Sequence, residues 1–193
     1  MFDVITARDF YVMVIEDFDD FMEEPHSARR ALHCAISAYH LHEWIWCDWL
    51  KNDTAARERI GIKKSKDDFV AWVLRANVWF HYVQAMANGT KHLGRTNEFA
   101  TIKVVAAPFA FDQLTAGWDQ GVCNGPIHYV SGSLPVGPKG QGYLILDLGE
   151  DAVPETRWMP VAHILEVVLR FWRDFFRYYR PGEDIPASHH HVD

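Results

Sequence analysis

Two polar lines of histidine, amide and hydroxyl side chains contain the residues of this chain best suited to chemistry. They run through two long, mostly apolar stretches, residues 26–51 and 66–92. The first line comprises Arg30, His33, Ser37, His40 and Glu43, and the second comprises Asn77, His81, Gln84, Asn88 and His92. Steps of three or four residues place each line on one side of an α-helix. Because imidazole can act as an acid, a base or a ligand near neutral pH, the lines predict a site for proton transfer or ligand binding.

The two lines would form a single site if their helices packed antiparallel with the polar sides together. The histidines and Asn88 would then share a partly buried polar seam. The predicted catalytic residues are His81, Asn88, Lys91 and His92, and the predicted ligand-binding residues are His33, Ser37, His40, Glu43, Asn77 and Gln84. A purely structural seam is the alternative, because an unpaired buried polar group costs about 1–3 kcal/mol and mutual pairing avoids that cost.

A metal ion is a further candidate ligand, since imidazole and carboxylate groups both bind transition metals. Carboxylate-bridged di-metal bundles use Glu-x-x-His pairs, whereas the helices here offer only the reversed order, as in His40 and Glu43. We therefore assign no metal ligand, and no cofactor is indicated. The run His189–His191 lies in a tail where it could bind nickel resin without a biological role.

The elements that must position these residues are mainly helical. The capping pattern of Thr6 with Asp9 begins a helix that ends before Pro25, and the pattern of Ser65 with Asp68 begins another. Helices are expected at about 6–24, 27–50, 54–60, 66–92 and 160–180, and strands at 101–105, 127–134 and 143–148. On the outer face of the first helix, acidic residues form what we interpret as a solvated surface, with a cation site as the alternative: Glu16, Asp19, Asp20 and Glu23.

These elements predict a mainly α fold: a bundle of four long helices and one short one, with a small antiparallel β-sheet inserted before the C-terminal helix. The sheet would occupy about residues 99–148. Residues 1–182 would form a single domain, and residues 183–193 would be a flexible tail. The 193 residues suffice for one well-filled core.

Composition narrows the class of protein. A net charge of −7 argues against broad nucleic-acid binding, although a local basic groove is compatible with it. Aromatic residues make up 14% of the chain and include eight Trp, more large side chains than one core requires. Some of them would then face a partner subunit, which favours a homodimer. Three cysteines without paired spacing fit a reducing compartment. The start of the chain does not resemble a secretory signal, and no apolar run approaches the roughly 20 residues of a membrane span, so we expect a soluble cytoplasmic protein.

The segment Arg75-Ala-Asn-Val-Trp-Phe-His81 resembles the Arg-x4-6-His motif of HEPN domains. Those domains are dimeric helical bundles, many of which act as metal-independent ribonucleases in defence and stress systems. Asn88-Gly-Thr-Lys91-His92 supplies a cation beside an imidazole near a helix end. The resemblance implies RNA as a partner, with Lys91 holding phosphate while His81 or His92 moves a proton. A catalytically silent relative of the family would bind without cleaving.

Three functional hypotheses follow. The first is a HEPN-like module directed at RNA, either an enzyme or a silent binding relative. The second is a non-enzymatic bundle whose polar seam binds a metal ion or a small ligand. The third is an oligomeric scaffold in which the polar seam is purely structural. No nucleophile elbow, phosphate loop or dinucleotide fingerprint is present in the sequence to favour another enzyme class.

Overall fold

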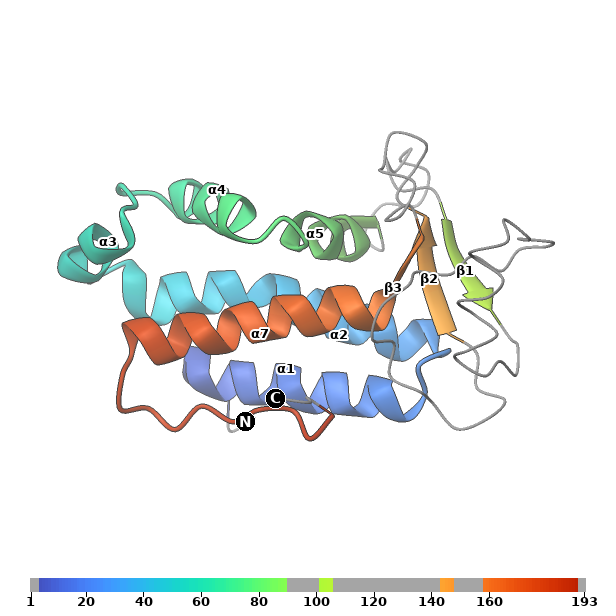
Figure 1. Cartoon of the computed structure of the whole chain (residues 1–193). Coiled ribbons are helices and arrows are strands. Elements are labelled where there is room, and N and C mark those ends of the chain that lie inside the picture. The colour runs from blue at the N-terminus through green and yellow to red at the C-terminus, as the bar shows by residue number, and fades with distance from the viewer. Residues whose placement is uncertain (1–3, 90–100, 106–142, 148–157, 191–193) are drawn as a thin grey trace.

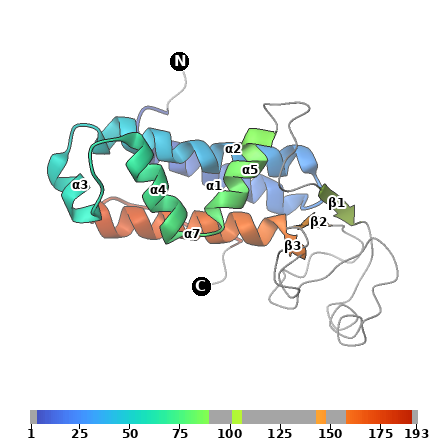
Figure 2. The same ribbon diagram turned by 90° about the horizontal axis from the view of Figure 1, so that it is seen from above.

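The computed structural model describes residues 4–89, 101–105, 143–147 and 158–190. Three long helices run side by side: α1 (Ala7–Glu23), α2 (Ala28–Ile45) and α7 (Val161–Tyr179) (Figure 1). Seen from above, the shorter helices α3 (Thr54–Ile60), α4 (Lys66–Ala76) and α5 (Phe80–Gly89) lie across α2 and α7 (Figure 2). The expectation of a mainly α fold is confirmed.

Local sequence explains where most helices begin. Thr6 and Asp9 form a capping box at the start of α1, and Ser65 and Asp68 form another at the start of α4, both as expected. In each box the hydroxyl accepts a backbone N–H while the carboxylate accepts the N–H of the capping residue, so unpaired groups of the first turn are satisfied. Helix α3 ends at Gly61, whose φ of 78° is one that glycine adopts without strain.

The core lies where α1, α2 and α7 meet. Small side chains on α2, namely Ala31, Ala35 and Ala38, are fully or almost fully buried and allow close approach of the neighbouring helices. Trp172 of α7 is fully buried, and its indole N–H donates to the carbonyl oxygen of Ala38 at 3.2 Å. The small residues of α2 therefore pack against a large aromatic side chain.

The expected single helix over residues 66–92 is wrong, because the chain breaks at Asn77 between α4 and α5. Asn77 has φ −140° and ψ 102°, which is extended rather than helical. Its buried side-chain carbonyl accepts the backbone N–H of Trp79 at 3.0 Å. This local hydrogen bond replaces the helical one, as short amide side chains readily allow. The expected helix at 27–50 also changes character near its end, where Trp46–Leu50 forms a π-helical turn.

Three short strands stand at one end of the bundle: β1 (Thr101–Val105), β2 (Tyr143–Asp147) and β3 (Trp158–Pro160). They pair antiparallel in the order β1-β2-β3, with Val104 opposite Leu144 and Leu146 opposite Met159. The expected strand at 127–134 lies outside the described residues, whereas β3 was not expected from the sequence. The backbone N–H of Leu144 donates to the carbonyl of Pro25 at 3.2 Å, which links β2 to the turn between α1 and α2.

Residues 183–190, expected to be part of a flexible tail, run along α1 (Figure 1). We call residues 184–190 the C-terminal strap. Ile185 is only 6% exposed and belongs to the hydrophobic core. The hydroxyl of Tyr11 donates to the carbonyl of Pro186 at 3.1 Å. These contacts differ from the expectation because the sequence of the strap has no periodicity from which packing could be inferred. Among the described helices, none is long and apolar enough to cross a membrane.

Candidate functional site

The first polar line does not face a single neighbour. Ser37 donates a hydrogen bond of 2.6 Å to Asp17 of α1. His40 lies 3.1 Å from Glu43, which forms an ion pair of 2.8 Å with Lys66 at the start of α4. His33 is exposed. The line is therefore divided between a contact with α1, a contact with α4 and solvent.

The second polar line is divided by the break in the helix. Asn77 is used in capping α4, and both His81 and Asn88 are exposed on α5. Gln84 contacts the other line's helix, donating to the hydroxyl of Tyr39 at 3.4 Å. Lys91 and His92 lie outside the described residues.

The partly buried seam expected from the sequence is thus not formed by its described members, because His33, His81 and Asn88 are all exposed. For the second line the physical reason is the break at Asn77, which interrupts the helical register on which that line depended. The catalytic and ligand-binding roles assigned to these residues stay predictions.

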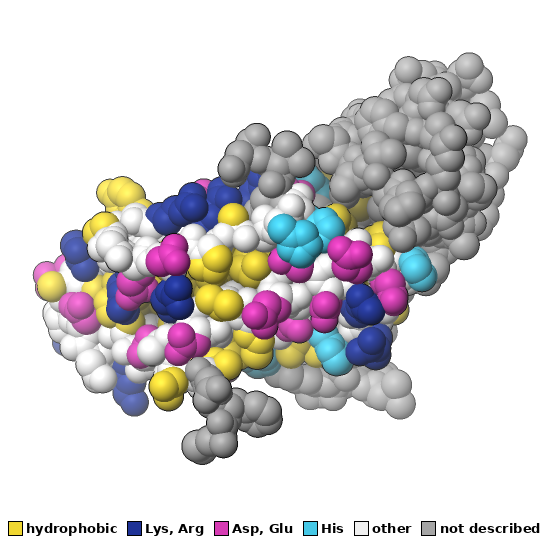
Figure 3. Space-filling model, turned by 90° about the horizontal axis from the view of Figure 1, so that it is seen from below, with side chains coloured by type: hydrophobic (Ala, Val, Ile, Leu, Met, Phe, Trp, Pro, Cys, Tyr) yellow, Lys and Arg dark blue, Asp and Glu magenta, His cyan; other side chains and the backbone are white. Residues whose placement is uncertain are grey.

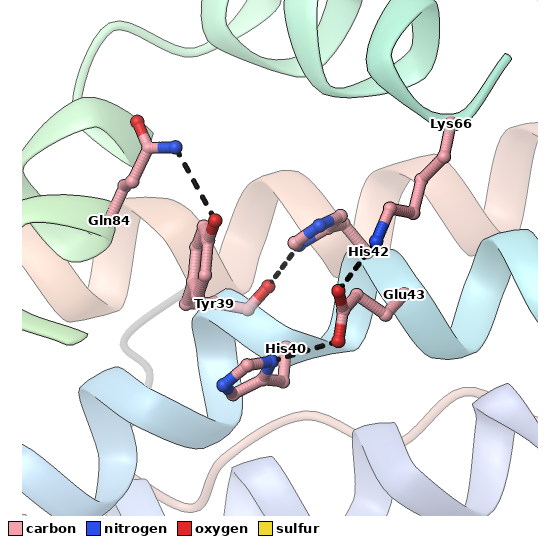
Figure 4. A network of polar contacts seen from close by, with 6 residues as sticks. All are labelled: Tyr39, His40, His42, Glu43, Lys66 and Gln84. Carbon is pink, nitrogen blue, oxygen red and sulfur yellow. Dashed lines mark hydrogen bonds and ion pairs between the residues drawn. The ribbon is translucent and has the colours of Figure 1, made fainter. Parts of the chain in front are cut away.

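A polar network that includes His40, Glu43 and Gln84 of the two lines ties α2 to α4 and α5 (Figure 4). His42, which belongs to neither polar line, is 2% exposed, and its Nδ1–H donates to the backbone carbonyl of Tyr39. Burial lowers the pKa of His42, and the hydrogen bond to Tyr39 offsets part of that effect. The Lys66 ammonium holds the pKa of Glu43 down to about 2. The hydrogen bond of His42 pairs two polar groups that packing has buried, as is expected of a network with a structural role.

The strongest candidate site lies where the C-terminal strap meets α1. Asp19, His189 and His190 place one ligand atom each within 4.8 Å of one another. His189 Nδ1 is 2.8 Å from Asp19 Oδ2. Glu23, one turn further along α1, has its Oε1 3.3 Å from His190 Nε2 and 4.0 Å from His189 Nε2. The lower side of the molecule carries histidine side chains directly beside acidic ones (Figure 3).

Ser188 positions the carboxylate of this cluster. Ser188 is 4% exposed, and its hydroxyl donates to Asp19 Oδ1. The Oγ of Ser188 in turn accepts the backbone N–H of His190 at 3.0 Å. Because Oδ1 is occupied by Ser188, Oδ2 of Asp19 remains directed at His189. Such outer hydrogen bonds are typical of sites that hold a metal ligand in a fixed orientation.

His190 Nε2 is shielded from solvent and makes no hydrogen bond within the described part of the chain. Glu23 Oε1 satisfies the distance of an ion pair, but its direction does not meet hydrogen-bond geometry. A shielded nitrogen without a hydrogen bond is costly. Coordination of an ion by this nitrogen would remove the cost.

The donor set fits a transition metal better than magnesium or calcium. Imidazole nitrogens suit zinc, copper and nickel, whereas magnesium and calcium prefer sites made of oxygen. Zinc binds nitrogen and oxygen at about 2.0–2.2 Å, so tetrahedral ligands lie about 3.4 Å apart. The 3.3 Å between His190 Nε2 and Glu23 Oε1 is close to this value, whereas the 2.8 Å between His189 Nδ1 and Asp19 Oδ2 is a hydrogen-bond distance. The side chains of the cluster must therefore shift to receive an ion.

Both halves of this cluster are present in the sequence, but local patterns do not connect them. The helical pattern favours a solvated face for Asp19 and Glu23, with a cation site as the alternative, and His189 and His190 fall in the expected tail. One available signal was the spacing of the two carboxylates, four residues apart on one side of a helix. Nothing local indicates that the tail returns to that helix.

Comparisons with known protein families, with curated proteins and with solved structures find no match to this chain. The HEPN resemblance therefore rests on the short motif alone. The class that the fold itself defines is a mainly helical bundle.

Proposed function

We propose that this protein is a transition-metal-binding helical bundle in which Asp19, His189 and His190 ligate an ion of the zinc type. The observation that carries the proposal is the convergence of three ligand atoms within 4.8 Å from opposite ends of the chain. Ser188 and Asp19, which form one hydrogen bond of this cluster, are 169 residues apart in sequence. Such an arrangement depends on the folded bundle, which distinguishes it from chelation by a loose histidine tail.

Glu23 would be the fourth ligand. Its Oε1 lies 3.3 Å from His190 Nε2. His189 presents Nδ1 to Asp19 and Nε2 to Glu23, and one imidazole gives one nitrogen to an ion, so Glu23 must turn toward the ion. Its side chain is 65% exposed and can turn without disrupting packing. Four nitrogen and oxygen ligands would complete the tetrahedral shell typical of a structural zinc site. We therefore favour an ion held for binding or structure over an ion that retains an open position for catalysis.

The charge of α1 supports a cation at this place. Its C-terminal half carries Asp17, Asp19, Asp20 and Glu23, and no basic residue lies in its last turn. The C-terminal end of a helix has a partial negative charge, so carboxylates there are unfavourable. Arg30 pairs with Glu24 at 3.0 Å and offsets part of this charge. A bound cation would offset more of it, next to Asp19 and Glu23.

Isothermal titration calorimetry with zinc on EDTA-treated protein tests the proposal. We expect one equivalent to bind the wild type, and Asp19→Asn to weaken binding at least tenfold although every histidine is retained. His33→Ala is the matched control, because it removes an exposed histidine from α2 and should leave zinc affinity unchanged. Magnesium should not compete.

Chelation by the tail alone would give a different result. Asp19→Asn would then bind zinc as tightly as the wild type, and protein unfolded in urea would bind equally well. Either outcome would overturn the proposal, as would the absence of zinc binding by the wild type.

The second candidate function is the RNA-directed HEPN-like module, enzymatic or silent. It is favoured by one observation: the break at Asn77 lies inside the Arg75–His81 motif, and both of those side chains are exposed. In this candidate His81 and Asn88, with Lys91 and His92, act on RNA across a homodimer. Purified protein should cleave or bind single-stranded RNA without added metal, and His81→Ala should abolish cleavage while folding is retained. Wild type that neither cleaves nor binds RNA would remove this candidate.

A further inference from the structure

We infer that a bound metal ion stabilises the docked state of the C-terminal strap on α1, so that occupancy of the metal site controls how firmly the strap is held. We call this effect the latch. This inference rests on the metal site proposed above and adds a regulatory consequence to it. The ligands come from two segments of the chain: Asp19 and Glu23 lie on α1, and His189 and His190 lie on the strap. An ion that binds both must favour the docked strap over the detached one.

The strap follows α1 in parallel for most of its length. Arg8 donates to the carbonyl of Asp184 at 2.8 Å near the start of the helix, and His190 lies beside Glu23 at its end. The strap ends in a turn at residues 189 and 190, closed by the hydrogen bond from the His190 backbone N–H to the Ser188 hydroxyl. It is therefore held against the helix near both of its ends.

The anchors differ in strength. Near the start of the strap, Ile185 is buried in the core and the hydroxyl of Tyr11 donates to Pro186. At the far end the contacts are polar, and His189 and Glu23 have side chains that are 64% and 65% exposed. Ion pairs with such exposed groups contribute little. The far end therefore depends on the hydrogen bonds of Ser188 unless an ion is bound.

An ion bound at the cluster would strengthen the attachment of the far end of the strap to α1. When the free ion is present at about 100 times its dissociation constant, the docked state gains a factor of about 100 over the detached state. The reverse coupling must also hold, since linkage between two equilibria is reciprocal. A substitution that does not alter a ligand can still weaken docking of the strap. If it makes the detached strap the major form, it should also weaken zinc binding.

Hydrogen–deuterium exchange with mass spectrometry, together with zinc calorimetry, tests the latch. In wild type, zinc at about 100 times its dissociation constant should slow exchange in a peptide covering the strap by up to about 100-fold. A peptide from the middle of α2 should change much less. Asp19→Asn, the matched control, should lose the zinc effect on the strap.

Ile185→Ala gives a second test at a residue that is not a ligand. Removing its buried side chain should speed exchange of the strap without zinc by about 30-fold. Zinc should restore part of the lost protection. Because the core of the bundle is otherwise intact, the α2 peptide indicates whether the variant has folded.

The outcomes separate the latch from the metal site. Zinc that binds in calorimetry but leaves exchange of the strap unchanged would overturn the latch and leave the proposed function standing. Equal slowing in the strap and in α2 would also overturn the latch, because the ion would then stabilise the whole fold. If zinc fails to bind at all, both the proposed function and the latch are wrong.

Discussion

Ser188→Ala should weaken zinc binding although Ser188 is not a ligand. Its hydroxyl donates to Asp19 Oδ1 and accepts the backbone N–H of His190, so a single oxygen orients a carboxylate and an imidazole-bearing residue together. Loss of such a supporting hydrogen bond commonly lowers metal affinity by about 10–100-fold. In free energy this corresponds to about 1.4–2.8 kcal/mol.

The same substitution should have a smaller effect on the stability of the protein without metal. A hydrogen bond to a charged group contributes about 1.5–3 kcal/mol. Asp19 is 18% exposed, so water can replace part of the lost bond. The strap can also detach without unfolding the bundle, which limits the loss of global stability to the free energy of docking. We expect a decrease of about 1 kcal/mol in the free energy of unfolding.

Ser37→Ala is the matched control. Ser37 also donates to a carboxylate of α1, with 2.6 Å between its Oγ and Asp17 Oδ2, but it is not part of the cluster. Its removal should lower stability by about 1–2 kcal/mol and leave zinc affinity within about threefold of wild type. Calorimetry gives the affinity, and urea denaturation in EDTA gives the stability. Equal loss of zinc affinity in both serine variants, or no loss in Ser188→Ala, would show that Ser188 does not orient the ligands.

Three further predictions concern the bundle. Because the folded-state pKa of His42 is below its ordinary 6.5, the unfolded chain binds the proton more readily and stability should fall as the pH drops below about 6.5; urea denaturation of His42→Phe should show a shallower pH dependence. Glu43, at a pKa of about 2 against an ordinary 4.5, stabilises the fold above pH 4.5 and loses this effect on acidification to about 2; Glu43→Gln should remove about 0.2–1 kcal/mol at pH 7, since both partners are over 40% exposed. Trp172→Phe loses the bond to Ala38 and leaves a void, so unfolding should become about 2 kcal/mol easier and melting should fall by about 4–8 °C. Trp44→Phe, at a half-buried position, should shift melting much less, and an equal shift would contradict the central role of Trp172.

Local patterns in the sequence were sufficient to predict most helices. The capping boxes at Thr6 and Ser65 depend on residues three positions apart, so the sequence contains all the information they need. The apolar periodicity of α7 and its termination near Arg180 have the same local origin. Asn77 shows the limit of this reasoning. Its stretch is apolar and periodic on both sides, and a single side-chain hydrogen bond to Trp79 decides that the helix breaks.

The sequence by itself determined a mainly helical protein, with acidic residues on the first helix and a run of histidines at residues 189–191. Only the tertiary structure decided which polar residues meet. It buried His42 rather than the predicted histidines, and it brought Asp19 beside His189 and His190. The physical reason is that helix formation depends on residues within one or two turns. The meeting of a strap with a helix depends instead on Ile185 entering a core that exists only once the whole bundle has packed.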